Sequence, residues 1–169
     1  MNKTRERVIQ ISEPVTGQEE LDALSSPLET GWLTQGPKVK EFENQFSRKH
    51  DSKYALASTS CTTALHLALS SIDIAPGDEV IVPAFTWVST ANVVVYCGAK
   101  PVFVDVRKDT YNVDTDKLKR NISSKTKAII PVHLFGLCCD IDEVKSILPN
   151  NVSIIEDAAC AVGAKYKKK

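Results

Sequence analysis

Short apolar runs alternate with stretches of helical periodicity along the chain from residue 51 onward. The apolar runs predict buried strands, because parallel strands that are covered on both faces are almost continuously apolar. The predicted strands span residues 53–57, 79–82, 101–104, 127–132 and 152–155. Between them, apolar residues recur at the spacing of one helix face. The predicted helices span residues 62–71, 89–97, 114–121 and 139–148.

This alternation indicates an α/β fold, with a mainly parallel, doubly wound sheet and right-handed crossovers. The chain before residue 51 lacks such strand-like runs. Its pattern predicts a weak helix over 17–24 and an amphipathic helix over 39–50, with a glycine- and proline-containing loop between them. We therefore expect an N-terminal arm with helices over residues 1–50 and an α/β domain over residues 51–169.

The composition is that of an ordinary globular protein, with 43% hydrophobic and 25% charged residues. Basic and acidic residues balance at 21 each, so the charge gives no support for nucleic-acid or acidic-membrane binding. No apolar run approaches the ~18 residues of a transmembrane helix, and the N-terminal MNKTRERVIQ has no apolar segment of a secretory signal. These features predict a cytoplasmic protein without membrane or nucleic-acid partners.

The five cysteines form no pattern typical of a disulfide framework or a zinc site. Their number is odd, no CxxC pair is present, and Cys138 and Cys139 are adjacent, which is poor geometry for chelating one ion. We expect no bound metal, and unpaired cysteines fit a reducing cytoplasm.

Residues 53–69 have the pattern of an anion-binding turn. A predicted strand leads through small, mostly hydroxylated residues into a predicted helix; the small residues are Ser58, Thr59, Ser60, Cys61, Thr62 and Thr63. The first N–H groups of a helix have no partner within the helix, and the helix dipole adds positive charge there, so a phosphate can bind. An ordinary helix N-cap explains the same residues, and this stretch alone leaves both alternatives open.

Further polar and aromatic residues follow the other predicted strands. Ligands of open α/β sheets bind at the carboxyl ends of the strands, where this sequence has Phe85, Trp87, Asp105, His133, Glu156 and Asp157. The set suits a flat, phosphorylated heteroaromatic ligand, with its phosphate on the amides of residues 61–63, its ring against Trp87 and a protonated ring nitrogen on Asp157. Pyridoxal 5′-phosphate needs this set, because a carboxylate keeps its pyridine nitrogen protonated.

These residues also have purely structural interpretations. Trp87 would by default be a partly buried core aromatic residue, and Asp157 a helix cap. Asp105 is expected to be a structural cap. A role for His133 is left open, because its place at the strand ends is the only argument for one. No His–Asp pattern supports Cys61 as a nucleophile, and the phosphate turn explains this residue better.

Several segments, in the right order, resemble the DegT/DnrJ/EryC1/StrS family of pyridoxal-phosphate-dependent sugar aminotransferases. The segments are GWLTQGPKVKEFE, SCTTALHLAL, PGDEVIVPAFTWVSTANVVVYCGAKPVFVDV, TYNVD, TKAIIPVHLFG and IIEDAACAVGA. The resemblance extends from about Ser12 to Tyr166. It implies that residues 51–169 form part of the cofactor-binding large domain of aspartate-aminotransferase-type (fold type I) enzymes, with an active site at a homodimer interface.

The resemblance also implies roles for individual residues of a pyridoxal-phosphate site. The residues that it places in the phosphate turn are Cys61, Thr62 and Thr63. It matches Trp87 to the aromatic residue that stacks on the pyridoxal ring, and Asp157 to the aspartate at the ring nitrogen. Cys160 stands where most relatives have a glutamine near the ring hydroxyl, and a thiol is a weaker hydrogen-bond partner than an amide.

The resemblance places the family's Schiff-base lysine some tens of residues beyond the IIEDAA segment. The last lysines of this chain follow that segment too closely to match it; they are Lys165, Lys167, Lys168 and Lys169. We therefore assign no catalytic residue and expect a truncated chain without the C-terminal strands of the large domain and without the small domain. Such a chain would bind the cofactor weakly and be inactive alone.

The function implied for the intact protein is transfer of an amino group from an amino acid, with glutamate as the expected donor, to a nucleotide-linked keto-sugar. The product would serve polysaccharide, lipopolysaccharide or amino-sugar biosynthesis. Two alternatives remain open. One is a non-catalytic remnant or partner-binding fragment, and the other is a related pyridoxal-phosphate-dependent sugar dehydratase, in which a histidine replaces the lysine.

Overall fold

The computed structural model describes residues 13–167 of the chain. The chain divides into two compact units, Met1–Ala55 and Leu56–Lys169, whereas the sequence pattern changes after residue 50. The N-terminal stretch that we expect to lack a secretory signal lies outside the described residues, as do Lys168 and Lys169.

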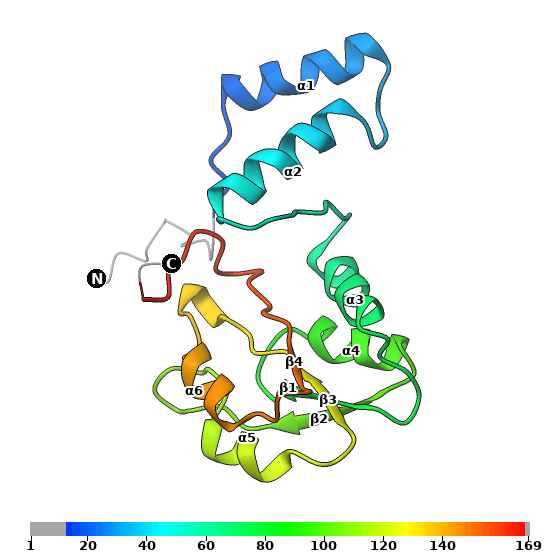
Figure 1. The fold of residues 1–169 in the computed structure, drawn as a ribbon. Coiled ribbons are helices and arrows are strands. Elements are labelled where there is room, and N and C mark those ends of the chain that lie inside the picture. The colour runs from blue at the N-terminus through cyan, green and yellow to red at the C-terminus, as the bar shows by residue number, and fades with distance from the viewer. Residues whose placement is uncertain (1–12, 168–169) are drawn as a thin grey trace, which may run out of the picture. The chain divides into compact units, whose positions relative to one another are not determined.

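In the first unit, the described residues form helices α1 (Gln18–Thr30) and α2 (Pro37–Lys49), shown in Figure 1. Helix α1 ends at Gly31, whose φ of 71° lies in the left-handed region that glycine adopts without strain. Helix α2 begins at Pro37, at a position where the missing N–H has no helical partner to lose. The helix predicted over 17–24 is therefore longer in the structure, and the predicted loop is shorter.

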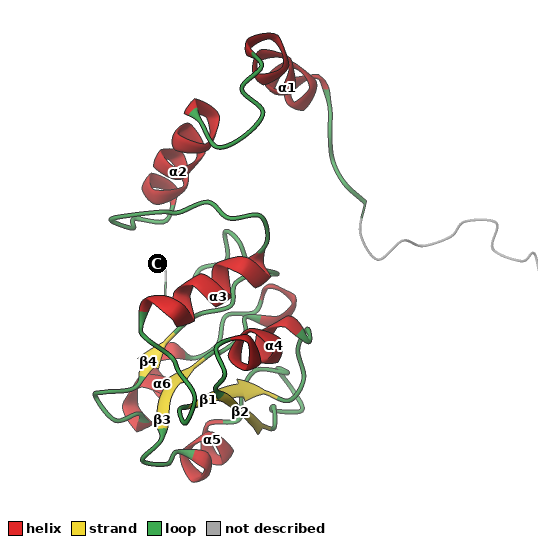
Figure 2. Ribbon diagram, turned by 90° about the vertical axis from the view of Figure 1, so that its right-hand side faces the viewer, coloured by secondary structure: helices red, strands yellow, loops and turns green. Residues whose placement is uncertain are grey.

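The second unit contains a parallel sheet of four strands in the order β2-β1-β3-β4. The strands are β1 (Glu79–Pro83), β2 (Lys100–Val104), β3 (Thr126–Ile129) and β4 (Ser153–Ile154). The α-helices of this unit are α3 (Cys61–Ser71), α4 (Ser89–Tyr96), α5 (Thr115–Asn121) and α6 (Ile141–Ile147). A short 3₁₀ turn, η1 (Leu134–Gly136), follows β3. Figures 1 and 2 show the helices on both faces of the sheet.

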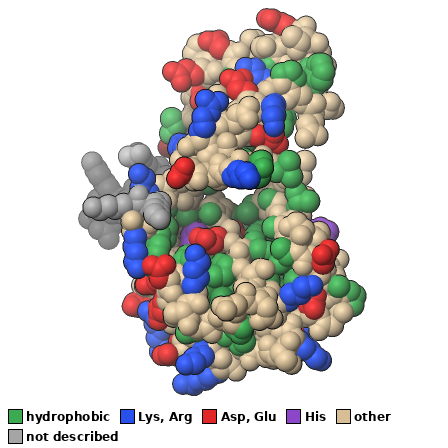
Figure 3. All heavy atoms as spheres, in the orientation of Figure 1, with side chains coloured by type: hydrophobic (Ala, Val, Ile, Leu, Met, Phe, Trp, Pro, Cys, Tyr) green, Lys and Arg blue, Asp and Glu red, His purple; other side chains and the backbone are tan. Residues whose placement is uncertain are grey.

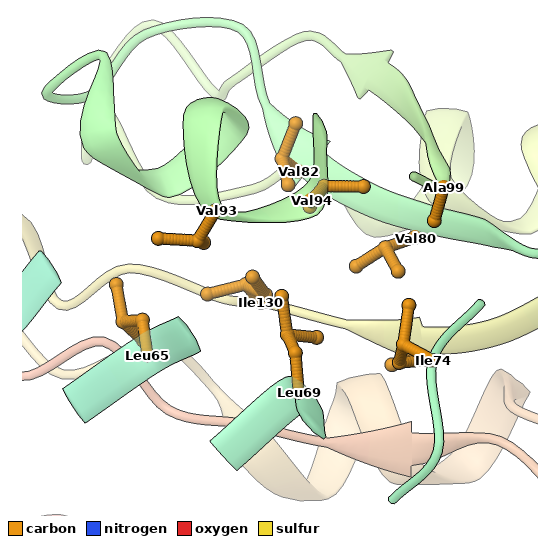
Figure 4. Close-up of a cluster of buried hydrophobic side chains, with 10 residues drawn as sticks. Leu65, Leu69, Ile74, Val80, Val82, Val93, Val94, Ala99 and Ile130 are labelled. Carbon is orange, nitrogen blue, oxygen red and sulfur yellow. The ribbon is translucent and has the colours of Figure 1, made fainter. Parts of the chain in front are cut away.

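Two buried hydrophobic clusters lie on opposite faces of the sheet, because successive side chains of β1 point to alternate faces. One cluster joins β1 to α3 and α4 (Figure 4), and its members include Val80, Val82, Leu65, Leu69, Val93 and Val94. The other joins β1 to α5 and α6, and its members include Ile81, Leu118, Ile141 and Val144. Burial on both faces explains why the strand sequences are almost continuously apolar.

The strand predicted over residues 53–57 is wrong. These residues have no strand in the structure, and the side chains of Tyr54 and Leu56 are 79% and 66% exposed. A strand needs a neighbour that takes its backbone hydrogen bonds, and no ladder joins this segment to a strand of the described chain. The apolar run has the composition of a strand, but it joins no ladder of the four-stranded sheet.

The strands predicted over 127–132 and 152–155 are shorter in the structure, yet both segments continue in extended form. The Ile130 N–H donates to the Ile81 carbonyl at 2.9 Å, and the Ile155 N–H donates to the Ile129 carbonyl at 3.0 Å. An isolated parallel bridge then pairs Val132 with Asp157. These continuations carry Asp157 to the carboxyl end of β3.

No helix within residues 13–167 has the length and apolar character needed to cross a membrane.

Candidate functional site

The N-terminus of α3 is closed on one side by its own cap and open on the other. The Thr63 N–H donates to Ser60 Oγ at 3.2 Å, and the Ser60 N–H donates back to Thr63 Oγ1 at 3.0 Å. This capping box uses both the amide and the hydroxyl of Thr63. The N–H groups of Cys61 and Thr62 have no acceptor among the described residues. The predicted phosphate turn therefore offers two backbone donors, and the hydroxyl of Thr63 is committed to the cap.

A hydroxyl pair joins the start of α3 to the start of α4. Thr62 Oγ1 donates to Ser89 Oγ at 3.0 Å. Because Ser89 accepts in this bond, its own proton is available to a ligand, and no acceptor for it occurs among the described residues. Sequence reasoning missed Ser89. The signal that would have found it is its place at the first position of a helix that follows a strand at the same edge of the sheet.

The Asp157 side chain is buried, with 5% of the residue exposed, and its backbone extends the parallel ladder. The Asp157 N–H donates to the Pro131 carbonyl at 2.9 Å, and the Asp157 carbonyl accepts from the His133 N–H at 3.0 Å. Its carboxylate accepts from three groups of the protein. Thr90 Oγ1 donates to Oδ2 at 3.0 Å, while the Ala159 N–H and the Cys61 thiol donate to Oδ1 at 3.2 and 3.6 Å.

The contact between Cys61 and Asp157 brings two predicted parts of the site together. Burial, followed by the charge of Asp157 and its hydrogen bond, raises the pKa of the Cys61 thiol to about 11, and the nearby Cys160 adds to this effect. Cys61 is therefore a neutral thiol near pH 7 and donates a hydrogen bond. This protonation state argues against a nucleophilic role, because a thiolate is the reactive form.

Trp87 lies in the loop between β1 and α4 and is 76% exposed, so it is not a core residue of this unit. Its carbonyl accepts from the Thr90 N–H at 3.1 Å, at the turn whose Thr90 hydroxyl contacts Asp157. Phe85 and Phe135 are also exposed, and hydrophobic side chains are visible at the surface in Figure 3. The exposed indole on this turn is accessible to a ligand. Stacking on a cofactor ring remains a prediction.

His133, whose role the sequence left open, is buried and bonded within the protein. Its Nε2 lies 2.9 Å from Glu156 Oε2, and its Nδ1 accepts from the Cys139 N–H at 3.0 Å. Because Nδ1 is an acceptor, we assign the ring proton to Nε2, which donates to Glu156. This hydrogen bond holds the pKa of the Glu156 carboxyl below its usual range. Both ring nitrogens are therefore occupied, and His133 has a structural role.

Asp105 has structural contacts, as expected. Its carboxylate accepts from Lys117 Nζ at 2.8 Å, and its carbonyl accepts from the Asp114 N–H at 3.0 Å. Cys160 is exposed and close enough to influence the pKa of Cys61. The predicted contact of Cys160 with a ring hydroxyl remains a prediction.

The residues that meet at this edge of the sheet fit a flat, phosphorylated pyridine. Two free helix N–H groups suit a phosphate, and a buried carboxylate on fixed donors suits a protonated ring nitrogen. Thr90 and Ala159 complete the site, and sequence reasoning missed both. A threonine inside a helix and an alanine amide give no chemical signal in a single sequence.

Comparisons with known proteins show which family the chain resembles. A sequence model of the DegT/DnrJ/EryC1/StrS aminotransferase family matches residues 14–169. The spore coat polysaccharide biosynthesis protein SpsC of Bacillus subtilis is 42% identical over 170 aligned residues, which are 100% of this chain and 44% of that protein. The chain thus spans less than half the length of this relative.

Solved structures show the same fold. The putative sugar aminotransferase Spr1654 from Streptococcus pneumoniae, in its PMP-form, superposes with a TM-score of 0.88 and 36% identity, over 92% of this chain and 43% of that one. A GDP-4-keto-6-deoxymannose-3-dehydratase with a trapped PLP-glutamate geminal diamine superposes with a TM-score of 0.89 and 31% identity, over 95% and 43% of the two chains. The predicted α/β class, with part of the fold type I large domain, is confirmed.

Proposed function

Because the chain belongs to the DegT/DnrJ/EryC1/StrS aminotransferase family, we propose that the protein binds pyridoxal 5′-phosphate and serves amino-group transfer to a nucleotide-linked keto-sugar. The observation that supports cofactor binding is the contact between α3 and Asp157, where Cys61 Sγ lies 3.6 Å from Asp157 Oδ1. Residues 96 positions apart in the sequence thereby place a helix N-terminus beside a buried carboxylate.

Each part of the site has a distinct task in this proposal. The amides of Cys61 and Thr62 and the hydroxyl of Ser89 bind the phosphate. Trp87 covers one face of the ring, and Asp157 holds the proton on the ring nitrogen. The bound cofactor supplies an electron sink for the substrate carbon. Cys160 faces the ring hydroxyl and offers a weak hydrogen bond there.

The substrates and partners follow from the family and from its named members. An amino-acid donor, which we propose to be glutamate, and a nucleotide-linked sugar are the reactants. The likeness to SpsC supports a role in polysaccharide biosynthesis. In this proposal the amino sugar can also be a precursor of lipopolysaccharide. We also propose a homodimer in the cytoplasm, with the Schiff-base lysine in sequence beyond residue 169.

Cofactor binding tests this proposal directly. Pyridoxal 5′-phosphate or pyridoxamine 5′-phosphate is titrated into the protein while the absorbance and induced circular dichroism of the ring are recorded. We expect saturable binding by the wild type and at least about tenfold weaker binding by Asp157→Asn, because a buried charge pair is lost. Asp142→Asn, which removes an exposed carboxylate on α6, is the matched control. No saturable signal, or equal binding by Asp157→Asn, would contradict the proposal.

A second candidate function, removal of a sugar hydroxyl, is supported by the structural likeness to a sugar dehydratase. A keto-sugar nucleotide and glutamate are supplied, together with the cofactor, to the protein extended beyond residue 169, because we assign no catalytic residue within this chain. An amino sugar with 2-oxoglutarate indicates the transaminase, and a deoxysugar indicates the dehydratase. Borohydride reduction followed by peptide mapping identifies any lysine joined to the cofactor. Cofactor binding without either product indicates the non-catalytic alternative.

A further inference from the structure

The Asp157 carboxylate is held by three hydrogen-bond donors of the protein. An ionised carboxylate has about four positions at which it accepts hydrogen bonds. The Ala159 N–H and the Cys61 thiol occupy Oδ1, and the Thr90 hydroxyl occupies Oδ2. Since no other donor to this carboxylate occurs in the described part of the chain, one position on Oδ2 remains for a ligand. The oxygen that the Thr90 hydroxyl contacts is the one that is left to meet a ring nitrogen.

Burial makes this contact matter. Thr90 is 0% exposed, so its hydroxyl has no water to bond in place of the carboxylate. Its oxygen also lies 3.4 Å from Thr86 Oγ1. Since an ionised carboxylate only accepts, Thr90 donates to Asp157 and is left to accept from Thr86. The hydrogen bonds thus run in one direction, from Thr86 through Thr90 to the carboxylate.

We infer that Thr90 is a positioning residue that holds the Asp157 carboxylate ionised and aimed at the ring nitrogen of the cofactor. This inference rests on the proposed function. Without the hydroxyl, the buried negative charge loses a hydrogen-bond donor. Its pairing with a protonated ring nitrogen is then weaker, and the carboxylate oxygen is no longer fixed in direction. Thr90 acts only through Asp157 and is not a catalytic residue.

The test uses pyridoxamine 5′-phosphate labelled with nitrogen-15 in the ring, because the shift of that nucleus reports ring protonation independently of turnover. For Thr90→Val, which keeps the shape and removes the hydroxyl, we expect about tenfold weaker binding, the size of one hydrogen bond to a charged group. We also expect the ring signal to move toward the unprotonated position. Thr90→Ser keeps the hydroxyl and should restore both values.

Two further variants separate positioning from general damage. Thr90→Ala also removes the hydroxyl but leaves a different volume, so it gives the same test if the valine variant does not fold. Thr126 is a buried threonine at the start of β3 whose hydroxyl accepts from the Ser123 N–H at 2.9 Å. Thr126→Val should lower stability and leave the ring signal unchanged.

The outcomes distinguish this inference from the function on which it rests. If the wild type does not bind the labelled compound, both fail. If the wild type binds with a protonated ring and the hydroxyl-free variants give the same signal and affinity, only the role of Thr90 fails. A loss in Thr90→Ser equal to that in Thr90→Val also overturns the inference, because the hydroxyl would then not be the cause.

Discussion

At the scale of single residues, the site depends on which groups already have partners. Thr63 and His133 are both placed where sequence rules predict ligand contacts, yet their polar atoms are bonded within the protein. Within residues 13–167, the N–H groups of Cys61 and Thr62 have no acceptor. A single sequence identifies the chemical type of a side chain but not its partner. It therefore predicted Cys61 and Asp157 as parts of one site, but not their direct contact, and it left the role of His133 undecided.

The neutral state of Cys61 gives a measurable prediction. Asp157→Asn removes the charge that helps to raise the thiol pKa, which should fall from about 11, while burial continues to raise it. Alkylation of Cys61 at a fixed, mildly alkaline pH should therefore be faster in Asp157→Asn than in the wild type. The measurement is mass spectrometry of the peptide that contains Cys61, with Asp142→Asn as control. An unchanged alkylation rate in Asp157→Asn would show that the carboxylate does not act on this thiol.

The pair of His133 and Glu156 predicts a pH dependence of stability. The hydrogen bond from His133 holds the folded pKa of the Glu156 carboxyl below its ordinary value. Its contribution to stability is therefore fully present above that value and is lost as the pH falls through the folded pKa. Glu156→Gln should be less stable than the wild type at neutral pH, and the difference should shrink in acid. Urea unfolding across this pH range measures it, and a constant difference would refute the assignment.

At the scale of elements, helices were more predictable than strands because helix signals are local. Asp114, the first residue of the helix predicted over 114–121, caps α5 by accepting from the N–H groups of Asp116 and Lys117. The helices predicted from residues 62 and 89 begin at Cys61 and Ser89. The strand predicted over 53–57 failed because a strand is decided by a distant neighbour. Thr90 was missed for the same reason, since its contact lies 67 positions away.

The capping box of α3 should contribute to the stability of the whole unit. Ser60→Ala removes the side chain that accepts from the Thr63 N–H, and a lost N-cap typically costs about 1 kcal/mol in free energy of unfolding. Ser71→Ala, at the other end of the same helix, removes only a hydroxyl bonded to the Ala68 carbonyl and should change stability by much less. Equal losses in the two variants, measured by urea unfolding, would argue against a special role of the cap.

At the scale of the whole molecule, the division into two units predicts where a protease cuts first. Lys53 lies just before the division, is exposed and belongs to no helix or strand. Lys127 lies in β3, and its ammonium donates to the Asp73 carbonyl at 2.6 Å. Brief trypsin treatment should therefore cleave at Lys53 well before Lys127, as followed by mass spectrometry. Early cleavage at Lys127 would show that the second unit is less well ordered than its packing indicates.

The contacts that hold Asp157 link the packing of the interior to the properties of the candidate site. Its backbone is fastened to the strand layer through Pro131 and His133, and its side chain is fastened to α4 through Thr90 and to α3 through Cys61. Asp157 thus connects the sheet layer to the helix layer formed by α3 and α4. A change in the core that shifts α4 over the sheet, such as a smaller side chain in place of Val93, would move Thr90 relative to Asp157. The protonation of the ring nitrogen of a bound cofactor would then change. Interior repacking and cofactor electronics should therefore evolve together.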